Sequence, residues 1–397
     1  MSRYARDNRP YVPKVQRAEL KEGNYMLRAI LVGSAIAIAV AAFGYGITRL
    51  LTPDTGWQSV DATTRTPAAR SIQLSYCYGQ GEMEATLERR SVANTYSDTL
   101  EAADEALSTE SGSQLASLWE NPNTPVQVGD ILYKALETYL AADSRGLFYA
   151  PLYSWYNSLF ACQSDDEAAM FDPTRDSGAA EYVRQVTAFV SQEDHIRLEL
   201  LPDNTVTLHV SQAYLDFCEE NGIEALVDFG WVKNAFLLDA VADALEAEGL
   251  NAAMLASDDG YSRCLTQTRF GLNLLEYQVG TPRRAAQIPC DGPISVAAVR
   301  AFPMDSRDEG SYYAWADGSF SAPYLDRDTG LLSAQNENLA LLSSGSVGQL
   351  ALAAAKTMAT WQMPDCTWVY SRGETVYCSD ASLEIQNLYI GYSRIDK

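Results

Sequence analysis

The sequence predicts an α+β domain behind one N-terminal transmembrane helix. Three observations lead to this prediction: an uncharged apolar run near the N-terminus, a globular composition after it, and helical and strand-like patterns that alternate along the remaining chain. Hydrophobic residues make up 47% and aromatic residues 10% of the 397 residues, which excludes a disordered or low-complexity protein. The sequence shows no internal repeat and no heptad pattern.

The apolar run spans residues 29–47, AILVGSAIAIAVAAFGYGI, and contains no charge, Pro, Asn or Gln. About 20 apolar residues suffice for a helix to cross a bilayer. The preceding residues 1–28 carry a formal charge of +4, and a basic flank stays on the cytoplasmic side. We therefore expect a cytoplasmic basic tail at 1–28, a transmembrane anchor at 29–51 and an extracytoplasmic main domain at the cell membrane. A cleaved signal peptide and a buried core helix are the alternatives.

The chain is strongly acidic, with 29 Lys and Arg against 52 Asp and Glu and a net charge of −23. Since residues 1–28 carry +4, residues 29–397 carry −27. Phosphate binding requires a basic surface, so no nucleic-acid partner is expected. The two histidines, His195 and His209, argue against a His-rich zinc site and a Ser-His-Asp triad. The sequence contains no phosphate loop, dinucleotide fingerprint or nucleophile elbow.

Secondary structure is predicted from side-chain spacing and turn residues. The polar residues 52–71 are predicted to be a linker. Helices are predicted at 97–107, 128–142, within 227–248 and at 343–358. Strands are predicted over 72–89, as a pair over 196–210, over 252–255 and in the last thirty residues. Loops are predicted at the acidic stretches 164–178 and 305–309, and irregular structure over 260–293.

All seven cysteines lie beyond the apolar run, where disulfides can persist in an extracytoplasmic domain. Cys366 and Cys378 flank a predicted hairpin and are candidates for a bridge, and Cys264–Cys290 is a second candidate. Buried free thiols are the alternative. No C-x-x-C spacing occurs, so a metal knuckle or redox dithiol has no support.

The order of five segments is more informative than any single motif. They are ALSTESGSQLASLWEN (106–121), TPVQVGDILYKALETYLAADSRGLF (124–148), LELLPDNTVTLHVS (198–211), LVDFGWVKNAFLLDAVADALEAEGLNAAMLASDDG (226–260), and YLDRDTGLLS (324–333) followed by SSGSVGQLALAAAKTMA (343–359). In this order they resemble the blocks of the FAD:protein FMN transferases of the ApbE type. The resemblance implies an ApbE-type (T-fold-like) α+β domain over 72–360, followed by a C-terminal β extension over 361–397.

Members of that family work outside the cytoplasmic membrane, and the resemblance implies their chemistry. They bind FAD with Mg²⁺ and move FMN onto a Ser or Thr hydroxyl of a partner protein, releasing AMP. The cation neutralises the pyrophosphate oxygens while the hydroxyl attacks. The family's ligands are an Asp and a Thr four residues later on the last helix, with main-chain oxygen from a glycine turn. A flavoprotein or redox-complex partner is implied.

This chain departs from the family pattern at the metal ligands. Aligning the last helix puts Gln349 at the Asp position and Ala353 at the Thr position, and Trp231 replaces the turn glycine. An amide offers one neutral oxygen and Ala none, so no metal ligand is predicted. A histidine of the family corresponds to Pro323, and its Lys- or Glu-type position corresponds to Asn234.

The resemblance implies six cofactor-binding candidates. They are Tyr78, Phe148, Tyr149, Asp228, Asn234 and Asp326. The aromatic members have packing in the core as an alternative, and an Asp before a helix also serves as an N-cap. Asp228 therefore has both a flavin-contacting and a capping interpretation.

Two functions of different classes follow. The first is a non-catalytic ApbE-like module that binds a flavin or a partner protein and assists assembly. The second is an active Mg²⁺-dependent FAD:protein FMN transferase with unusual ligands. Loss of the acidic and hydroxyl ligands favours the first, because two pyrophosphate charges would otherwise enter a domain that already carries −27. A surface adhesin is a third, weaker hypothesis.

Overall fold

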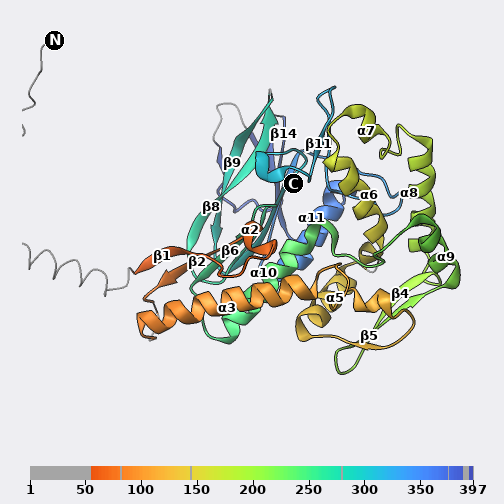
Figure 1. Ribbon diagram of the computed structural model, residues 1–397. Helices are drawn as coiled ribbons and strands as arrows, with labels where there is room; N and C mark the ends of the chain where they lie inside the picture. Colours follow the sequence, from red (N-terminus) through yellow and green to blue (C-terminus); the bar gives the residue numbers. More distant parts are fainter. Residues whose placement is uncertain are drawn as a thin grey trace, which may run out of the picture. The chain divides into compact units, whose positions relative to one another are not determined.

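The computed structural model describes residues 55–80, 83–143, 145–278, 280–373, 375–387 and 393–396 (Figure 1). Residues 55–397 form one compact unit of mixed helices and strands, which confirms the predicted α+β class. The expected tail at 1–28 and anchor at 29–51 lie outside the described residues. Within the described part of the chain, no helix has the length and apolar character that a membrane span requires.

The centre of the unit is a nine-stranded sheet in the order β1-β2-β6-β7-β10-β13-β14-β15-β17. Neighbouring strands pair antiparallel except for β15 and β17, which are parallel. The strands are β1 (Gly56–Val60), β2 (Ile72–Tyr78), β6 (Ala253–Ser257), β7 (Tyr261–Cys264), β10 (Ile294–Arg300), β13 (Asn338–Ser343), β14 (Thr367–Arg372), β15 (Thr375–Cys378) and β17 (Ser393–Asp396).

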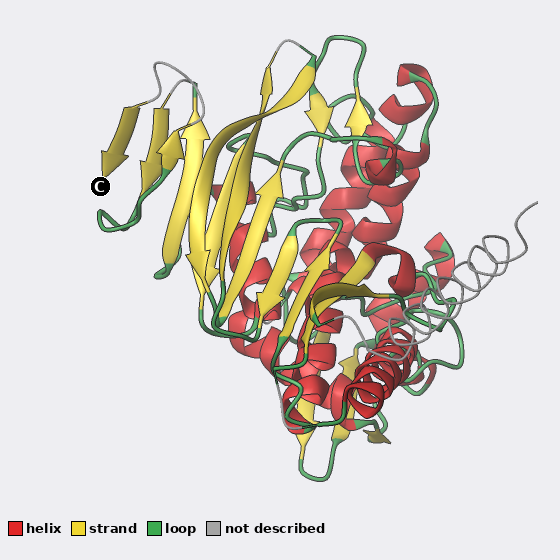
Figure 2. Ribbon diagram, turned by 90° about the vertical axis from the view of Figure 1, so that its left-hand side faces the viewer, coloured by secondary structure: helices red, strands yellow, loops and turns green. Residues whose placement is uncertain are grey.

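Side chains of the central strands alternate between two cores, as the period of a strand requires. Ala297 and Val299 of β10 face the larger core, which α10 (Lys233–Ala247) and α11 (Val347–Thr360) cover. Val296 faces a smaller core on the other side, with Leu274 and Ile288. The latter belong to β8 (Arg269–Gln278) and β9 (Thr281–Asp291), which form a second sheet with β16 (Gln386–Asn387). Figure 2 shows the helices gathered on one side of the large sheet.

Further helices extend the larger core away from the sheet. α3 (Ala85–Ala106) packs on α10, and α5 (Asp130–Ala142) packs on α11. The remaining helices are α2 (Ala68–Ser71), α4 (Ser117–Glu120), α6 (Ala150–Ala161), α7 (Asp165–Ala169), α8 (Ser177–Val190) and α9 (Gln212–Asn221), with 3₁₀ turns η1 (Gly146–Tyr149), η2 (Gly230–Val232) and η3 (Ser306–Asp308). A small sheet in the order β3-β5-β4 and a β11–β12 pair contain β3 (Val126–Gln127), β4 (Ile196–Leu201), β5 (Thr205–Val210), β11 (Tyr313–Ala314) and β12 (Phe320–Ser321).

Three predicted segments differ from the structure. The strand over 72–89 ends at Tyr78, because Gly79 adopts a φ of +82° and α3 starts soon after it. The acidic stretch 164–178 is partly helical: it contains α7 and the start of α8, which Ser164 and Asp176 cap by accepting hydrogen bonds from the backbone N–H groups of Glu167 and Ala179. Residues 260–293 are not irregular: they form β7, β8 and β9. Gly and Pro residues within these strands obscured their pattern.

Both ends of the described unit contribute to the large sheet. The segment 52–71, expected to be a linker, contains β1, which pairs with β2 from Gly56 opposite Tyr78 to Val60 opposite Leu74. At the other edge, β14, β15 and β17 extend the same sheet within 361–397. Neither proposed disulfide is formed, because Cys264, Cys290 and Cys366 are free thiols in the described structure. Cys264 and Cys290 are buried, as the alternative expected.

One carboxylate connects α10, α11 and β7. Asp239 of α10 accepts hydrogen bonds from the backbone N–H groups of Val347 (2.9 Å) and Gly348 (2.8 Å), the first residues of α11. It also accepts from Nη1 of Arg263 in β7, at 2.9 Å. Ser346, the N-cap residue of α11, donates its hydroxyl to the same carboxylate. Asp239 therefore satisfies helix N–H groups that have no partner within the helix, and it places negative charge at the positive end of the helix dipole.

We predict that Asp239→Ala lowers the free energy of unfolding by about 3–5 kcal/mol, since it leaves the mostly buried Arg263 without this partner. Ser346→Ala removes only the N-cap hydroxyl and should cost about 1 kcal/mol. Urea unfolding of the full-length protein in detergent, followed by circular dichroism, measures both values. Equal effects of the two substitutions would contradict the central role of Asp239.

Candidate functional site

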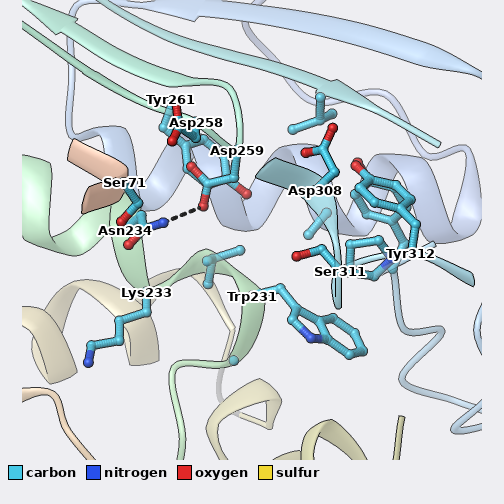
Figure 3. A pocket seen from close by; sticks show the side chains of 16 residues that line it. Ser71, Trp231, Lys233, Asn234, Asp258, Asp259, Tyr261, Asp308, Ser311 and Tyr312 are labelled. Carbon is cyan, nitrogen blue, oxygen red and sulfur yellow. Dashed lines mark hydrogen bonds between the residues drawn. The ribbon is translucent and has the colours of Figure 1, made fainter. Parts of the chain in front are cut away.

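A cavity of about 340 Å³ lies where η2 and the start of α10 meet β7, the end of β10 and α11. It lies at the lower end of the size range of small-molecule sites. Figure 3 shows aromatic and acidic side chains around it. The lining residues that bear on function are Ser71, Trp231, Asn234, Asp258, Asp259, Tyr261, Asp308, Ser311, Tyr312, Pro323, Tyr324 and Ala355.

The turn before α10 positions one wall of the cavity. Asp228 accepts a hydrogen bond from the backbone N–H of Gly230 at 2.9 Å, which holds the turn. Gly230 has a φ of +59°, and a Cβ there would lie 2.6 Å from Cε2 of Tyr153, so both conformation and space require glycine. Trp231 then packs edge-to-face on Tyr153 at 5.0 Å between ring centroids and donates Nε1–H to Asn157 at 2.9 Å. Its indole is thus fixed at the rim.

Lys233 and Asn234, the first two residues of α10, point in different directions, as Figure 3 shows. The Nζ of Lys233 lies 2.7 Å from Oδ1 of Asp104 in α3, so this cation is paired away from the cavity. Asn234 instead donates its amide to Oδ2 of Asp259 at 2.9 Å. Ser257 donates to the other oxygen of Asp259. Burial raises the pKa of Asp259 to about 6, although both hydrogen bonds favour its charged form.

Asp308 closes the opposite wall and is already paired. It accepts two hydrogen bonds from Nη2 of Arg300, at 2.6 and 2.7 Å, and one from the backbone N–H of Met304. Tyr312 and Tyr324 donate their hydroxyls to the carbonyl oxygen of Arg300, at 3.0 and 2.6 Å. The ion pair between Arg300 and Asp308 is almost fully buried. The prediction that 305–309 is a solvated loop is therefore wrong at Asp308.

Helix α11 presents alanine to the cavity. Its lining residue is Ala355, and Ala351, one turn earlier, is fully buried. Gln349 is exposed, and neither Gln349 nor Ala353 lines the cavity. The α11 side chain that lines the cavity is therefore Ala355, which supplies no ligand oxygen.

The other predicted cofactor residues lie apart from this cavity. Tyr78 is buried in β2, with its ring 4.9 Å from that of Tyr76. Phe148 and Tyr149 are buried in η1, and the Tyr149 hydroxyl donates to the carbonyl oxygen of Arg327. Asp326 holds a turn: its carboxylate accepts from the backbone N–H of Asp328 at 2.9 Å. Of the six candidates, only Asn234 lines the cavity.

Asp228 lines a second cavity of about 720 Å³, beside α6 and the end of α9. Burial raises the pKa of its carboxyl, while the backbone N–H groups of Gly230 and Phe229 oppose that rise. The hydrogen bond to Gly230 stabilises this turn, but Asp228 is not the expected N-cap: the N-cap residue of η2 is Phe229 and that of α10 is Val232.

The donor set of the first cavity does not fit a bound Mg²⁺, which prefers six oxygen ligands in octahedral geometry. Asp308 is engaged by Arg300, Asp259 is engaged by Asn234 and Ser257, Asp258 also has an interaction partner, and α11 offers methyl groups. Within the described ranges, no three His, Cys, Asp or Glu side chains come together in a way that could hold a metal ion. Among the described residues around the cavity, no cation is left unpaired for the phosphates of FAD, since Lys233 is paired with Asp104 and Arg300 with Asp308.

Sequence reasoning missed Asp308, Tyr312 and Tyr324. Their roles depend on Arg300, whose guanidinium and carbonyl group they contact from later loops. The sequence around Asp308 gives no sign of the contact with Arg300, because Asp308 lies among other charged residues that suggest an exposed loop. Ala355 was missed because α11 consists mainly of small residues, which do not distinguish one face from another.

Asp259 makes stability pH-dependent. The pKa of Asp259 in the folded protein, about 6, exceeds the ordinary value of 3.8. Its stabilising contribution to the free energy of unfolding is therefore fully present below pH 3.8 and is lost as pH rises through 6. We predict that Asp259→Asn gains up to about 3 kcal/mol relative to the wild type between pH 4 and pH 7. Urea unfolding of both proteins across this range tests it. A difference in unfolding free energy that stays constant with pH would contradict the assignment.

Comparison with known proteins identifies the fold. No family model and no curated protein matches the sequence. The structure is similar to the apo flavinyl transferase ApbE of Pseudomonas stutzeri, with a TM-score of 0.52 and 13% identity over 81% of this chain and 92% of that one. It is also similar to the ApbE protein of Thermotoga maritima, with a TM-score of 0.52 and 11% identity over 84% and 97%. The chain therefore has the fold of the ApbE flavin transferases, as its sequence blocks predicted.

Proposed function

We propose that this protein is a membrane-anchored, extracytoplasmic relative of the ApbE flavin transferases that binds a flavin or a partner protein without transferring FMN. The fold and the position of the cavity support a flavin-related role. The apolar segment 29–47 and its basic flank support the anchor and the orientation. The partner would be a flavoprotein or a redox complex at the same membrane.

The proposal depends mainly on one observation: the part of α11 that lines the cavity carries an alanine and no oxygen ligand. A metal-dependent transferase needs oxygen ligands on this helix to neutralise the pyrophosphate of FAD. Ala355 lines the cavity here, and Ala351 occupies the previous turn. Neither Gln349 nor Ala353 lines the cavity.

The charges around the cavity support the same conclusion. Asp258 and Asp259 lie on one side, and Asp308 on the other is balanced by Arg300. Two pyrophosphate charges would enter this acidic surrounding, where both described cations, Lys233 and Arg300, are already paired, and charges inside a pocket are poorly screened by salt. An uncharged ring system meets no such barrier.

The walls are suited to such a ring. Trp231, Tyr312 and Tyr324 present aromatic surface, and Asn234 and Ser311 add polar groups at the edges. Pockets for small molecules commonly combine apolar walls with a few polar groups that fix orientation. We propose that the cavity accepts the ring portion of a flavin, or an aromatic side chain of the partner.

We predict that the full-length protein binds riboflavin more tightly than FAD, because the pyrophosphate of FAD adds negative charge to an acidic cavity. Mg²⁺ should change either affinity by less than about twofold, because the described lining residues offer no free set of oxygen ligands for the cation. Flavin fluorescence titration with and without Mg²⁺ measures binding, and chromatography measures AMP. Mg²⁺-dependent tightening with AMP release would establish the alternative, an active transferase.

A matched pair of substitutions tests the cavity itself. Ala355→Leu fills the cavity and should weaken riboflavin binding at least tenfold, whereas Ala353→Leu lies outside the lining set and should leave it unchanged. Both substitutions keep helix propensity high. Thermal unfolding of each variant controls for folding. Equal affinities of the two variants would show that the ligand binds elsewhere.

A further inference from the structure

We infer that a cleft of about 370 Å³ between α5 and α10 binds a small organic cation, with its apolar body between the two helices and its charged group on the carboxylate of Asp243. One face of each helix lines the cleft, together with Thr99 of α3 and Arg263 of β7. The volume lies within the range of small-molecule sites. The cleft shares no lining residue with either cavity described above, so this inference does not rest on the proposed function.

Small side chains leave the space between the two helices. α5 and α10 each pack on α3 and on α11. They line the cleft with Ala135 from α5 and with Ala240 and Ala244 from α10, whose methyl groups lie one turn apart on the same face. Phe236, a turn earlier on that face, is 3% exposed and stacks on Tyr139 at 5.6 Å between ring centroids. The lining is therefore largely apolar and includes a buried aromatic ring.

Two of the three carboxylates in this lining are already engaged. Asp239 accepts hydrogen bonds from the start of α11 and from Arg263. Asp130, in the first turn of α5, accepts a hydrogen bond from the side-chain amide of Asn204. Both groups hold elements of the protein itself, so the carboxylate left for a ligand is that of Asp243, one turn after Asp239 on the same face of α10.

The surroundings of Asp243 leave its negative charge incompletely compensated. Burial raises the pKa of its carboxyl, and the neighbouring charge of Asp239 adds to this rise. Arg263 and Lys134 oppose the rise and Glu246 adds to it, each through its charge rather than through a hydrogen bond. Asp243 still reaches solvent, so a ligand has access to it. An ammonium group beside this carboxylate would stabilise the charged form.

The balance of charge in the cleft favours a cation over an anion. Among the described lining residues, three carboxylates stand against two cations, Lys134 and Arg263. Arg263 is paired with Asp239 and also lies 3.4 Å from Glu246, a further carboxylate outside the lining. Lys134 is exposed, so solvent and salt screen its charge. A ligand anion would therefore meet a net negative cleft, whereas a cation is attracted to it.

Three probes that share a phenyl ring and differ in charge test the cleft: benzylammonium, benzyl alcohol and phenylacetate. Calorimetric titration of the full-length protein in detergent, with titrations of detergent alone subtracted, measures each affinity. We expect benzylammonium to bind at least tenfold more tightly than benzyl alcohol, and phenylacetate to bind more weakly than either. Asp243→Asn should remove this tenfold preference. Asp216→Asn, in α9, removes the same charge outside the cleft and should retain the preference, which makes it the matched control.

A second pair of substitutions tests the space itself. Ala244→Leu fills the cleft and should weaken benzylammonium binding at least tenfold, whereas Ala355→Leu fills the first cavity and should leave this binding unchanged. Thermal unfolding followed by circular dichroism controls for folding, and the comparison at Asp243 decides if Ala244→Leu does not fold. Absence of benzylammonium binding, or a preference that survives Asp243→Asn, would overturn the inference. Loss of binding in Ala355→Leu alone would place the cation in the first cavity, and tightest binding of phenylacetate would contradict the assigned charge.

Discussion

The carboxylate of Asp239 connects the helices that surround the cavity with the sheet that supports them. It caps the first N–H groups of α11 from within α10, and Arg263 joins both to β7. Capping from a neighbouring helix fixes the rotation of α11 about its axis as well as its position. The rotation decides which side chains reach the cavity, so the alanine wall at Ala355 depends on a contact more than two helical turns away.

The sequence was sufficient for the general fold and for local turns. The order of its blocks led to the ApbE-type fold, and Gly230 forms a tight turn with a φ of +59°. The sequence was insufficient where distant residues decide. Asp308 lies among charged neighbours and was expected in solvent, but Arg300 from the end of β10 draws it into the interior. The many alanines of α11 also gave no way to tell from the sequence which of them lines the cavity.

The ionic groups near the cavity are arranged in local pairs. Lys233 is held by Asp104, Arg300 by Asp308, and the carboxylate of Asp259 by two neutral donors. Such satisfied groups stabilise the walls, since breaking a buried pair is more costly than the pair itself is favourable. They are correspondingly less available to a ligand. These pairs keep the cavity walls rigid and leave few charged groups to bind a charged ligand, which agrees with the proposed binding of an uncharged ring.

The two edges of the large sheet also set a distance. β1 and β17 are separated by eight strand spacings, which at about 4.8 Å each amounts to nearly 40 Å in an untwisted sheet. Two partners that each pair with one of these edges would therefore not contact each other, because the width of the sheet lies between them.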